Sequence, residues 1–161
     1  MKQASRAAVA YHRTSSAANV DGDSRPRQRA AIQTYAERHN IEVVREFYDP
    51  AVSGAVPLHD RPGFQKLLAY LRRNGARLVL VENASRFARD LMVQEVGFER
   101  LRSEGIDLIA ADNPGGFLDD TPTAVLVRQV LGAIAQFEKA QLVTKLKVAR
   151  DRKSEALGRR I

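Results

Sequence analysis

Strand-like and helix-like segments alternate four times along this chain, and the alternation restricts the fold more than any other feature. Short apolar runs predict four strands, at residues 7–11, 41–48, 78–81 and 106–111. Apolar positions at helical spacing predict four helices, at residues 24–40, 62–74, 90–104 and 122–157. Such chains form parallel sheets with right-handed helical crossovers. We therefore expect an α/β domain with a mostly parallel sheet of at least four strands, followed by a long C-terminal helix.

Functional groups gather in the loops that follow the predicted strands. In parallel sheets, sites lie at the carboxyl ends of the strands, which here are followed by residues 12–23, 49–60, 82–89 and 112–120. These loops, or the residue just after one of them, supply Arg13, Ser15, Arg61, Arg86 and Arg89. A guanidinium is a planar fork of donors that matches phosphate oxygens. A nearby serine hydroxyl could then attack phosphorus while the arginines stabilise the oxyanion charge.

Composition excludes several classes of function. The 161 residues are enough for one ordinary domain, and the absence of cysteine excludes disulfides and thiolate zinc sites. The three histidines have no metal-ligand spacing, so we expect no metal and no cofactor. No apolar run is long enough for a membrane span or an export signal. We expect a cytoplasmic protein with no membrane partner and no small-molecule substrate.

Positive charge is concentrated at the C-terminal end. The formal net charge is +7, and residues 138–161 hold eight basic and only three acidic residues. A basic segment on a nearly neutral domain favours a polyanionic partner such as DNA, although a solvated helix face would have the same composition. The candidate DNA-binding residues are Lys139, Lys145, Lys147, Arg150, Arg152, Lys153, Arg159 and Arg160.

Other α/β functions fit less well. No glycine-rich phosphate loop follows the first strand, and no acidic cluster marks a receiver-like domain. A Ser-His-Asp arrangement is also poorly supported, because His12 lies too near Ser15 in sequence to be placed as its base.

Five short blocks, in order, carry a resemblance to a known family. They are Tyr11-x-Arg13-x-Ser15; Gln28 at the start of the first helix; Phe47-Tyr48-Asp49 with Ser53-Gly54 and Arg61; Arg86-x-x-Arg89-Asp90; and Ala133-Ile134-Ala135-Gln136-Phe137-Glu138. Together they resemble the catalytic domain of serine recombinases, the resolvase/invertase group of site-specific DNA recombinases. The resemblance spans almost the whole chain and implies a three-layer resolvase-like core over residues 1–121, with a helix at 122–157 for dimerisation and DNA contact.

The resemblance also implies a chemical mechanism. Ser15 would attack a DNA phosphodiester and form a 5′-phosphoseryl link, with Arg13, Arg86 and Arg89 holding the scissile phosphate. Arg61 and Gln28 would support them, Asp49 would orient an arginine or assist proton transfer, and Tyr11 belongs to the same motif. No metal or ATP would be needed. The implied partners are double-stranded DNA and further copies of the chain, as a homodimer and as a tetramer in synapsis; on DNA the protein would be associated with the nucleoid.

Three departures from the family pattern bear on function. Ser85 stands where the family usually has an aspartate, so one arginine could lack a carboxylate partner. Ser16 adjoins Ser15, so the choice of nucleophile depends on the register of the motif. Residues 158–161 would begin a linker to a DNA-binding region that the chain lacks. The alternative function is a recombinase-like module that binds DNA or regulates without completing recombination.

Overall fold

The computed structural model describes residues 4–15, 24–115, 117 and 121–158. The chain forms two separately compact units, residues 1–120 and residues 121–161.

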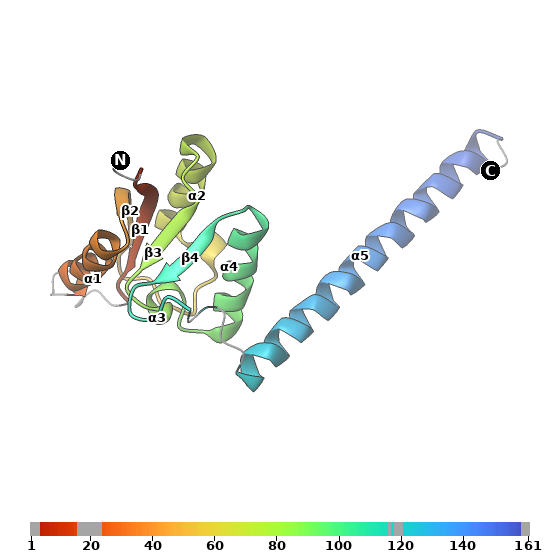
Figure 1. Ribbon diagram of the computed structural model, residues 1–161. Helices are drawn as coiled ribbons and strands as arrows, with labels where there is room; N and C mark the ends of the chain where they lie inside the picture. The colour runs from red at the N-terminus through yellow and green to blue at the C-terminus, as the bar shows by residue number, and fades with distance from the viewer. Residues whose placement is uncertain (1–3, 16–23, 116, 118–120, 159–161) are drawn as a thin grey trace. The chain divides into compact units, whose positions relative to one another are not determined.

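The first unit contains one parallel sheet of four strands (Figure 1). The strands are β1 (Arg6–Arg13), β2 (Ile41–Asp49), β3 (Leu78–Val81) and β4 (Asp107–Ala110). Their order is β2-β1-β3-β4, so the first strand is central and every neighbouring pair is parallel. The predicted α/β class and parallel sheet are confirmed. The predicted first strand ended too early, because β1 continues through Arg13, which pairs with Asp49.

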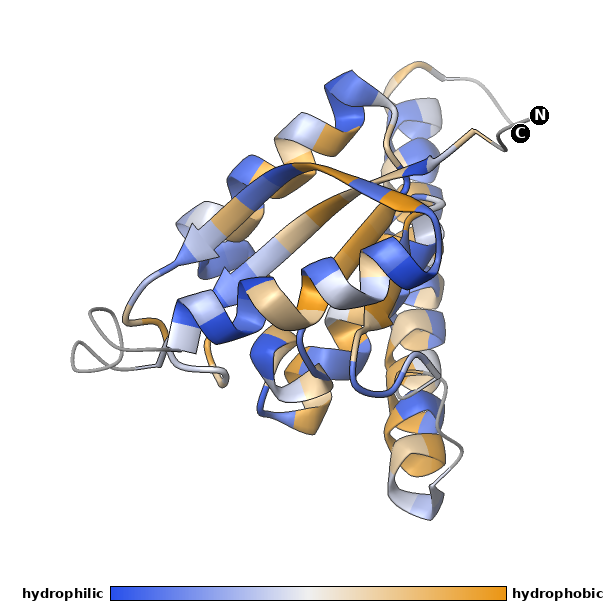
Figure 2. Ribbon diagram, turned by 60° about the vertical axis from the view of Figure 1, so that its left-hand side comes forward, coloured by the Kyte–Doolittle hydropathy of each residue, from blue (hydrophilic) through white to orange (hydrophobic). Residues whose placement is uncertain are grey.

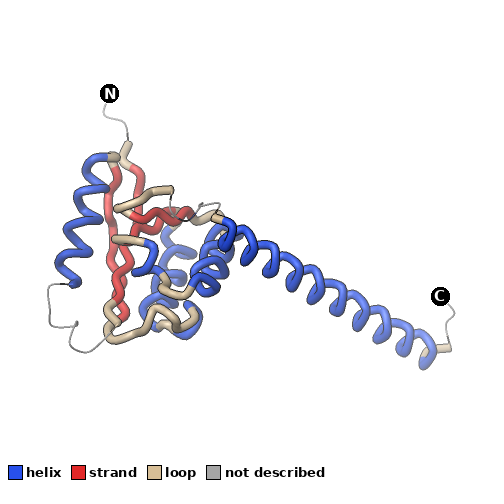
Figure 3. The backbone as a smooth tube through the Cα atoms, turned by 90° about the horizontal axis from the view of Figure 1, so that it is seen from below, coloured by secondary structure: helices blue, strands red, loops and turns tan. Residues whose placement is uncertain are grey.

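Helices cover both faces of this sheet (Figure 3). Helix α1 (Ser24–Arg38) packs on one face, and α2 (Pro62–Asn74) and α4 (Leu91–Ser103) pack on the other. Alternate side chains of a strand point to opposite faces. Accordingly, Ala8 and Ala10 of β1 pack with Ile32 of α1, whereas Val9 and Tyr11 belong to the core that includes α2. The two cores hold the carboxyl end of β1 in a fixed position.

Short helices also lie in the connecting loops. The 3-10 helix η2 covers Leu58–Asp60, and α3 covers Ala84–Phe87. We expected only a turn at 82–89, but Asn83 caps a single helical turn there by accepting a hydrogen bond from the backbone N–H of Arg86. One turn is too short to give a periodic apolar pattern.

The second unit is the helix α5, Pro122–Ala156. Thr121 caps it by accepting a bond from the N–H of Ala124. Its 35 residues extend about 52 Å at 1.5 Å per residue. Figure 2 shows hydrophobic and hydrophilic residues interspersed along it. Large apolar side chains are exposed at Leu126, Val130, Ile134, Phe137, Leu142, Val143 and Leu146. Over the described ranges, no helix has both the length and the apolar character that a membrane span needs.

Candidate active site

The carboxyl ends of β1 and β2 lie together and hold the segment that leads to Ser15. Beyond the Arg13–Asp49 pair, the N–H of Thr14 donates to the carbonyl of Asp49 at 3.2 Å. The carbonyl of Thr14 accepts from the N–H of Val52 at 2.9 Å. Ser15 follows directly and is half-buried. These bonds extend the pairing past the strand and place the candidate nucleophile at the predicted edge of the sheet.

Arg13 joins three chain segments beneath this edge. Its Nε donates to the carbonyl of Arg86 at 3.1 Å, its Nη1 to Val52 at 2.8 Å and its Nη2 to Ser85 at 2.7 Å. Only 1% of the residue is exposed. Burial, and then the nearby positive charge of Arg61, lower the pKa of Arg13 to about 10. The guanidinium is therefore still a cation at neutral pH, but each of its three nitrogens already donates to a backbone carbonyl.

Gln28 fixes the backbone of Arg13 from α1. Its Oε1 accepts from the N–H of Arg13 at 3.2 Å, and its Nε2 donates to the carbonyl of Arg13 at 3.1 Å. Nε2 also lies 3.1 Å from the Oγ of Ser24. Gln28 is fully buried. An amide can satisfy both polar groups of one residue in this way, which neither a carboxylate nor an amine can do.

Asp49 ties Tyr11 to the start of α2. One carboxylate oxygen accepts from the hydroxyl of Tyr11 at 2.8 Å and from the N–H of Phe64 at 3.0 Å; the other accepts from the N–H of Gly63 at 2.6 Å. A carboxylate at a helix N-terminus is favourable. Burial, with a smaller contribution from Asp49 and against the effect of Arg61, raises the pKa of Tyr11 well above its usual range. Tyr11 therefore acts as a neutral donor.

Arg61 is completely buried and is bound by carbonyl oxygens. Its Nε donates to Val56 at 3.0 Å and its Nη2 to Gly54 at 3.2 Å. Its Nη1 contacts the carbonyl of Phe87 and lies 3.4 Å from the hydroxyl of Tyr11. Arg61 therefore joins residues 50–57, the 50s loop, to α3 from the interior and supports the site without reaching its surface.

Arg86 and Arg89 are the more accessible cations. The Nε of Arg86 donates to Glu82 at 3.1 Å, and 18% of the Arg86 side chain is exposed. Arg89 is exposed, and its backbone N–H donates to the carbonyl of Gly54 at 3.0 Å. A Cβ on Gly54 would lie only 2.6 Å from the Cβ of Arg89 and 2.9 Å from Nη2 of Arg13. Glycine is what allows these segments to meet.

The structure thus brings together most residues singled out from the sequence. Hydrogen bonds connect Tyr11, Asp49 and Arg61 in one group and Arg13, Gln28 and Arg86 in another, and the strand pairing of Arg13 with Asp49 joins the two groups. The backbone of Arg89 donates to the carbonyl of Gly54, which also accepts from Arg61. Glu82 was not singled out, although an acidic residue directly after the buried strand at 78–81 was a usable signal. Ser16 lies outside the described residues. A surface with buried arginines below and accessible arginines above favours an anion.

The predicted DNA-binding residues lie mainly on α5. Its six exposed cations are Lys139, Lys145, Lys147, Arg150, Arg152 and Lys153. Arg159 and Arg160 lie outside the described residues. An exposed helix with this density of cations can follow a phosphate backbone.

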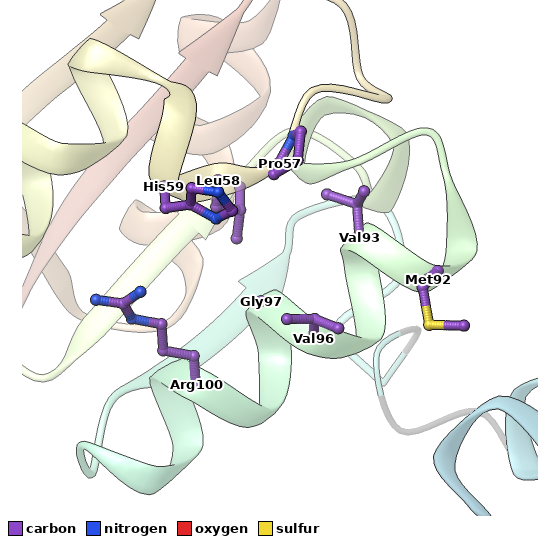
Figure 4. A pocket seen from close by; sticks show the side chains of 8 residues that line it. All are labelled: Pro57, Leu58, His59, Met92, Val93, Val96, Gly97 and Arg100. Atoms are coloured by element: carbon purple, nitrogen blue, oxygen red, sulfur yellow. The ribbon is translucent and has the colours of Figure 1, made fainter. Parts of the chain in front are cut away.

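Neither an apolar hollow nor a metal cluster offers a rival site in the described parts of the chain. A hollow of about 270 Å³ lies between η2 and α4, where Leu58 and His59 face Val93 and Val96 (Figure 4). It contains none of the residues predicted to be catalytic. Within the same ranges, no three His, Cys, Asp or Glu side chains are grouped to hold a metal ion.

Similar folds are found among solved recombinase structures. The N-terminal catalytic domain of TP901-1 integrase matches with a TM-score of 0.62 at 23% identity, over 84% of this chain and 98% of that one. A resolvase family site-specific recombinase from Streptococcus pneumoniae matches with a TM-score of 0.58 at 21% identity, over 93% and 99%. The C-terminal catalytic domain of ISC1926 TnpA, an IS607-like serine recombinase, matches with a TM-score of 0.55 at 23% identity, over 90% and 99%.

These similarities establish the fold, and a family comparison adds the sequence relationship. No curated protein matches this chain closely enough to count as a relative. The model of the resolvase N-terminal domain, however, matches residues 8–158, from the first strand to the end of the long helix. With the five blocks in order and four of them joined at one edge of the sheet, this match means that the chain belongs to the resolvase N-terminal domain family.

Proposed function

We propose that this chain carries out site-specific recombination by cutting and rejoining DNA strands through a covalent link to Ser15. The observation that carries the proposal is the gathering of arginines at the edge where Ser15 leaves the sheet: buried Arg13 donates to the carbonyl of Arg86, and buried Arg61 donates to the carbonyl of Phe87. Membership of the resolvase family and the fold shared with recombinase catalytic domains support it.

The proposed reaction is a transesterification. The Oγ of Ser15 attacks the phosphorus of a DNA phosphodiester and loses its proton, while the bond from phosphorus to the 3′ oxygen breaks. The 3′ oxygen leaves as a hydroxyl, and the 5′ phosphate stays on the serine. Attack by a 3′ hydroxyl reverses the step and releases the serine. The number of phosphoester bonds is conserved, so rejoining needs no ATP.

The proposed role of each residue follows from its exposure to solvent. Arg86 and Arg89, which reach the surface, bind the non-bridging oxygens of the phosphate and stabilise charge in the transition state. Arg13 contributes positive charge from below in this conformation, because its donors are engaged by carbonyls. Gln28, Arg61, Asp49 and Tyr11 keep the loops in place.

DNA and further copies of the chain complete the proposal. The exposed cations of α5 bind phosphates along the duplex. The exposed apolar residues of α5, among them Val130, Ile134 and Phe137, are covered by a second copy in a homodimer, and two dimers form the synaptic tetramer.

Trapping the covalent intermediate tests this function. The full chain is incubated with supercoiled plasmids carrying random inserts and with nicked duplexes, and the reaction is stopped with detergent. We expect a protein–DNA adduct that maps to Ser15 and is lost in Ser15→Ala. Ser103→Ala is the control, because Ser103 is an exposed serine bonded to the carbonyl of Arg100 at the end of α4. DNA binding without any adduct would instead favour the non-recombining module.

A further inference from the structure

Glu82 joins two arginines at the end of β3. Its Oε2 accepts from the Nε of Arg86 at 3.1 Å, and its Oε1 accepts from the Nε of Arg27 on α1 at 3.1 Å. Only 12% of the Glu82 side chain is exposed, so both ion pairs are partly shielded from water. One carboxylate therefore connects α1, β3 and α3 beside the proposed active site.

Because Glu82 binds the Nε of Arg86, the terminal nitrogens of the guanidinium stay accessible. The ion pair uses Nε, and the contact of Nη1 with the carbonyl of Arg13 is long, at 3.5 Å. The two terminal nitrogens are one of the pairs through which a guanidinium binds a phosphate in bidentate fashion, and Glu82 does not use them. Two arginines share one glutamate, so the group keeps a net positive charge that still attracts an anion.

The backbone of Arg86 is fixed independently of Glu82. Its N–H donates to the side chain of Asn83 at 2.9 Å, and its carbonyl accepts from Nε of Arg13 at 3.1 Å. A free arginine side chain loses rotamer entropy when it is immobilised. The backbone bonds leave the side chain of Arg86 free, and Glu82 restricts that side chain.

We infer that Glu82 is a positioning residue that orients Arg86 toward the scissile phosphate, an inference that rests on the proposed function. It supplies the carboxylate that the resemblance leads one to expect at position 85. Ser85 does not take this role, since its hydroxyl is bonded to the Oδ1 of Asn83 at 2.7 Å. The carboxylate that pairs with Arg86 lies four residues earlier in the chain, at Glu82.

The test compares Glu82→Gln with a matched control. Glu104→Gln changes another glutamate shared by two arginines, Arg72 at 3.2 Å and Arg100 at 3.8 Å, at the C-terminal end of α4. The readout is the Ser15–DNA adduct on nicked duplexes over a range of DNA concentrations. For Glu82→Gln we expect the rate at saturating DNA to fall about tenfold or more, because a misplaced group loses orientation. The half-saturating DNA concentration should change little. Glu104→Gln should leave both values unchanged.

Two further variants separate positioning from stability. Glu82→Asp keeps the negative charge. It should retain more activity than Glu82→Gln, although we expect the two variants to have the same thermal stability. In an Arg86→Lys background, Glu82→Gln should add little further loss, because the group that it orients is gone. If Glu82→Gln keeps the wild-type rate, or lowers the rate equally in the Arg86→Lys background, the inference is wrong.

A spectroscopic measurement keeps the inference separate from the proposed function. With ¹⁵N-labelled arginine, the Nε–H of Arg86 should give a resolved, slowly exchanging signal that disappears in Glu82→Gln and persists in Glu104→Gln. If the wild type forms no adduct, the proposed function fails, and this signal alone decides whether Glu82 orients Arg86. If the adduct forms and the signal is the same in Glu82→Gln, only the positioning role fails.

Discussion

The Nε of Arg13 donates to the carbonyl of Arg86 at 3.1 Å, which joins two residues 73 positions apart in the chain. The bond runs from a strand-end side chain to the backbone of α3, so the loop carrying the accessible arginine is built directly on the strand that leads to Ser15. A shift of either segment would move Ser15 relative to Arg86. The contact therefore couples fold stability to the proposed chemistry.

Gly54→Ala should damage both stability and activity. The added Cβ would lie 2.6 Å from the Cβ of Arg89 and 2.7 Å from its backbone nitrogen, and neither can move without its loop. We expect a loss of about 1–3 kcal/mol in the free energy of unfolding, the usual cost of overpacking. Urea unfolding measures it, and the adduct assay should show a parallel fall in rate.

Gly132→Ala is the matched control for this change. Gly132 lies in α5, and a Cβ there would meet nothing within 4 Å. Alanine is favoured over glycine in a helix by up to about 1 kcal/mol, so stability should stay the same or rise. Equal unfolding curves for Gly54→Ala and wild type would show that the 50s loop does not pack on Arg89 as described.

Asp49→Asn should destabilise the fold more than Tyr11→Phe. The carboxylate of Asp49 accepts three hydrogen bonds, whereas Tyr11→Phe removes only one of them. An asparagine in the same place would bring an NH₂ group toward a donor. We expect about 2–3 kcal/mol for Asp49→Asn and about 1 kcal/mol for Tyr11→Phe. Chemical denaturation of both variants gives the ranking, and the reverse order would mean that Asp49 does not hold the start of α2.

More of the fold than of the candidate site could be predicted from the sequence. Apolar runs such as Leu78–Val81 predict buried strands well, because burial on both faces leaves a plain signal. His12 and Arg13 were instead predicted to lie in a loop, because charged and polar residues at the end of a strand are also typical of loops. Their place in β1 depends on partners far along the chain, such as Asp49.

Neither the burial of Arg61 nor the role of Glu82 can be predicted from a single sequence, and the reason is the same. A charged residue is normally expected at the surface. Arg61 is completely buried only because carbonyls of Val56, Gly54 and Phe87 converge on it, and no local pattern encodes that convergence. Likewise, the residue type of Glu82 was visible, but its pairing with Arg86 and Arg27 requires the fold.

His12 should make stability fall at mildly acidic pH. It is fully buried, and its Nε2 lies 3.5 Å from Glu46 without a hydrogen bond. Burial lowers the pKa of His12 below 6.5; Arg25 and Arg29 also lower it, and Glu46 opposes them. The unfolded chain therefore binds a proton more readily than the folded one. This contribution to stability is complete above pH 6.5 and is lost as the pH falls below that value.

Thermal unfolding from about pH 7.5 to about pH 5.5, on either side of the ordinary histidine pKa, measures this effect. His12→Phe removes the titrating group and should flatten the slope in this window, whatever its effect on absolute stability. His59→Gln changes an exposed imidazole and is the control. An unchanged slope in His12→Phe would assign the pH dependence to other groups.

Ser16→Ala should be much milder than Ser15→Ala in the adduct assay. The motif register Tyr11-x-Arg13-x-Ser15 selects Ser15, and the hydrogen bonds of Thr14 with Asp49 and Val52 fix the residue just before it. Peptide mapping of the protein–DNA adduct is the direct measurement. A phosphoseryl peptide at Ser16 would move the nucleophile by one residue and overturn the assignment.

DNA binding by this chain should be weak, salt-sensitive and nearly independent of sequence. In the proposed function the exposed cations of α5 contact phosphates, and phosphate contacts carry no sequence information. The logarithm of the binding constant should fall with the logarithm of salt concentration with a slope of about −0.9 per phosphate neutralised.

Replacing Lys145 or Arg152 by alanine should reduce that slope by about one each. Arg73→Ala removes an exposed cation from α2 and should leave the slope unchanged. Titrations of random and candidate-site duplexes over a range of salt measure both quantities. Tight, salt-insensitive binding to one sequence would mean that side chains of this chain read base edges, and that α5 does more than follow the backbone.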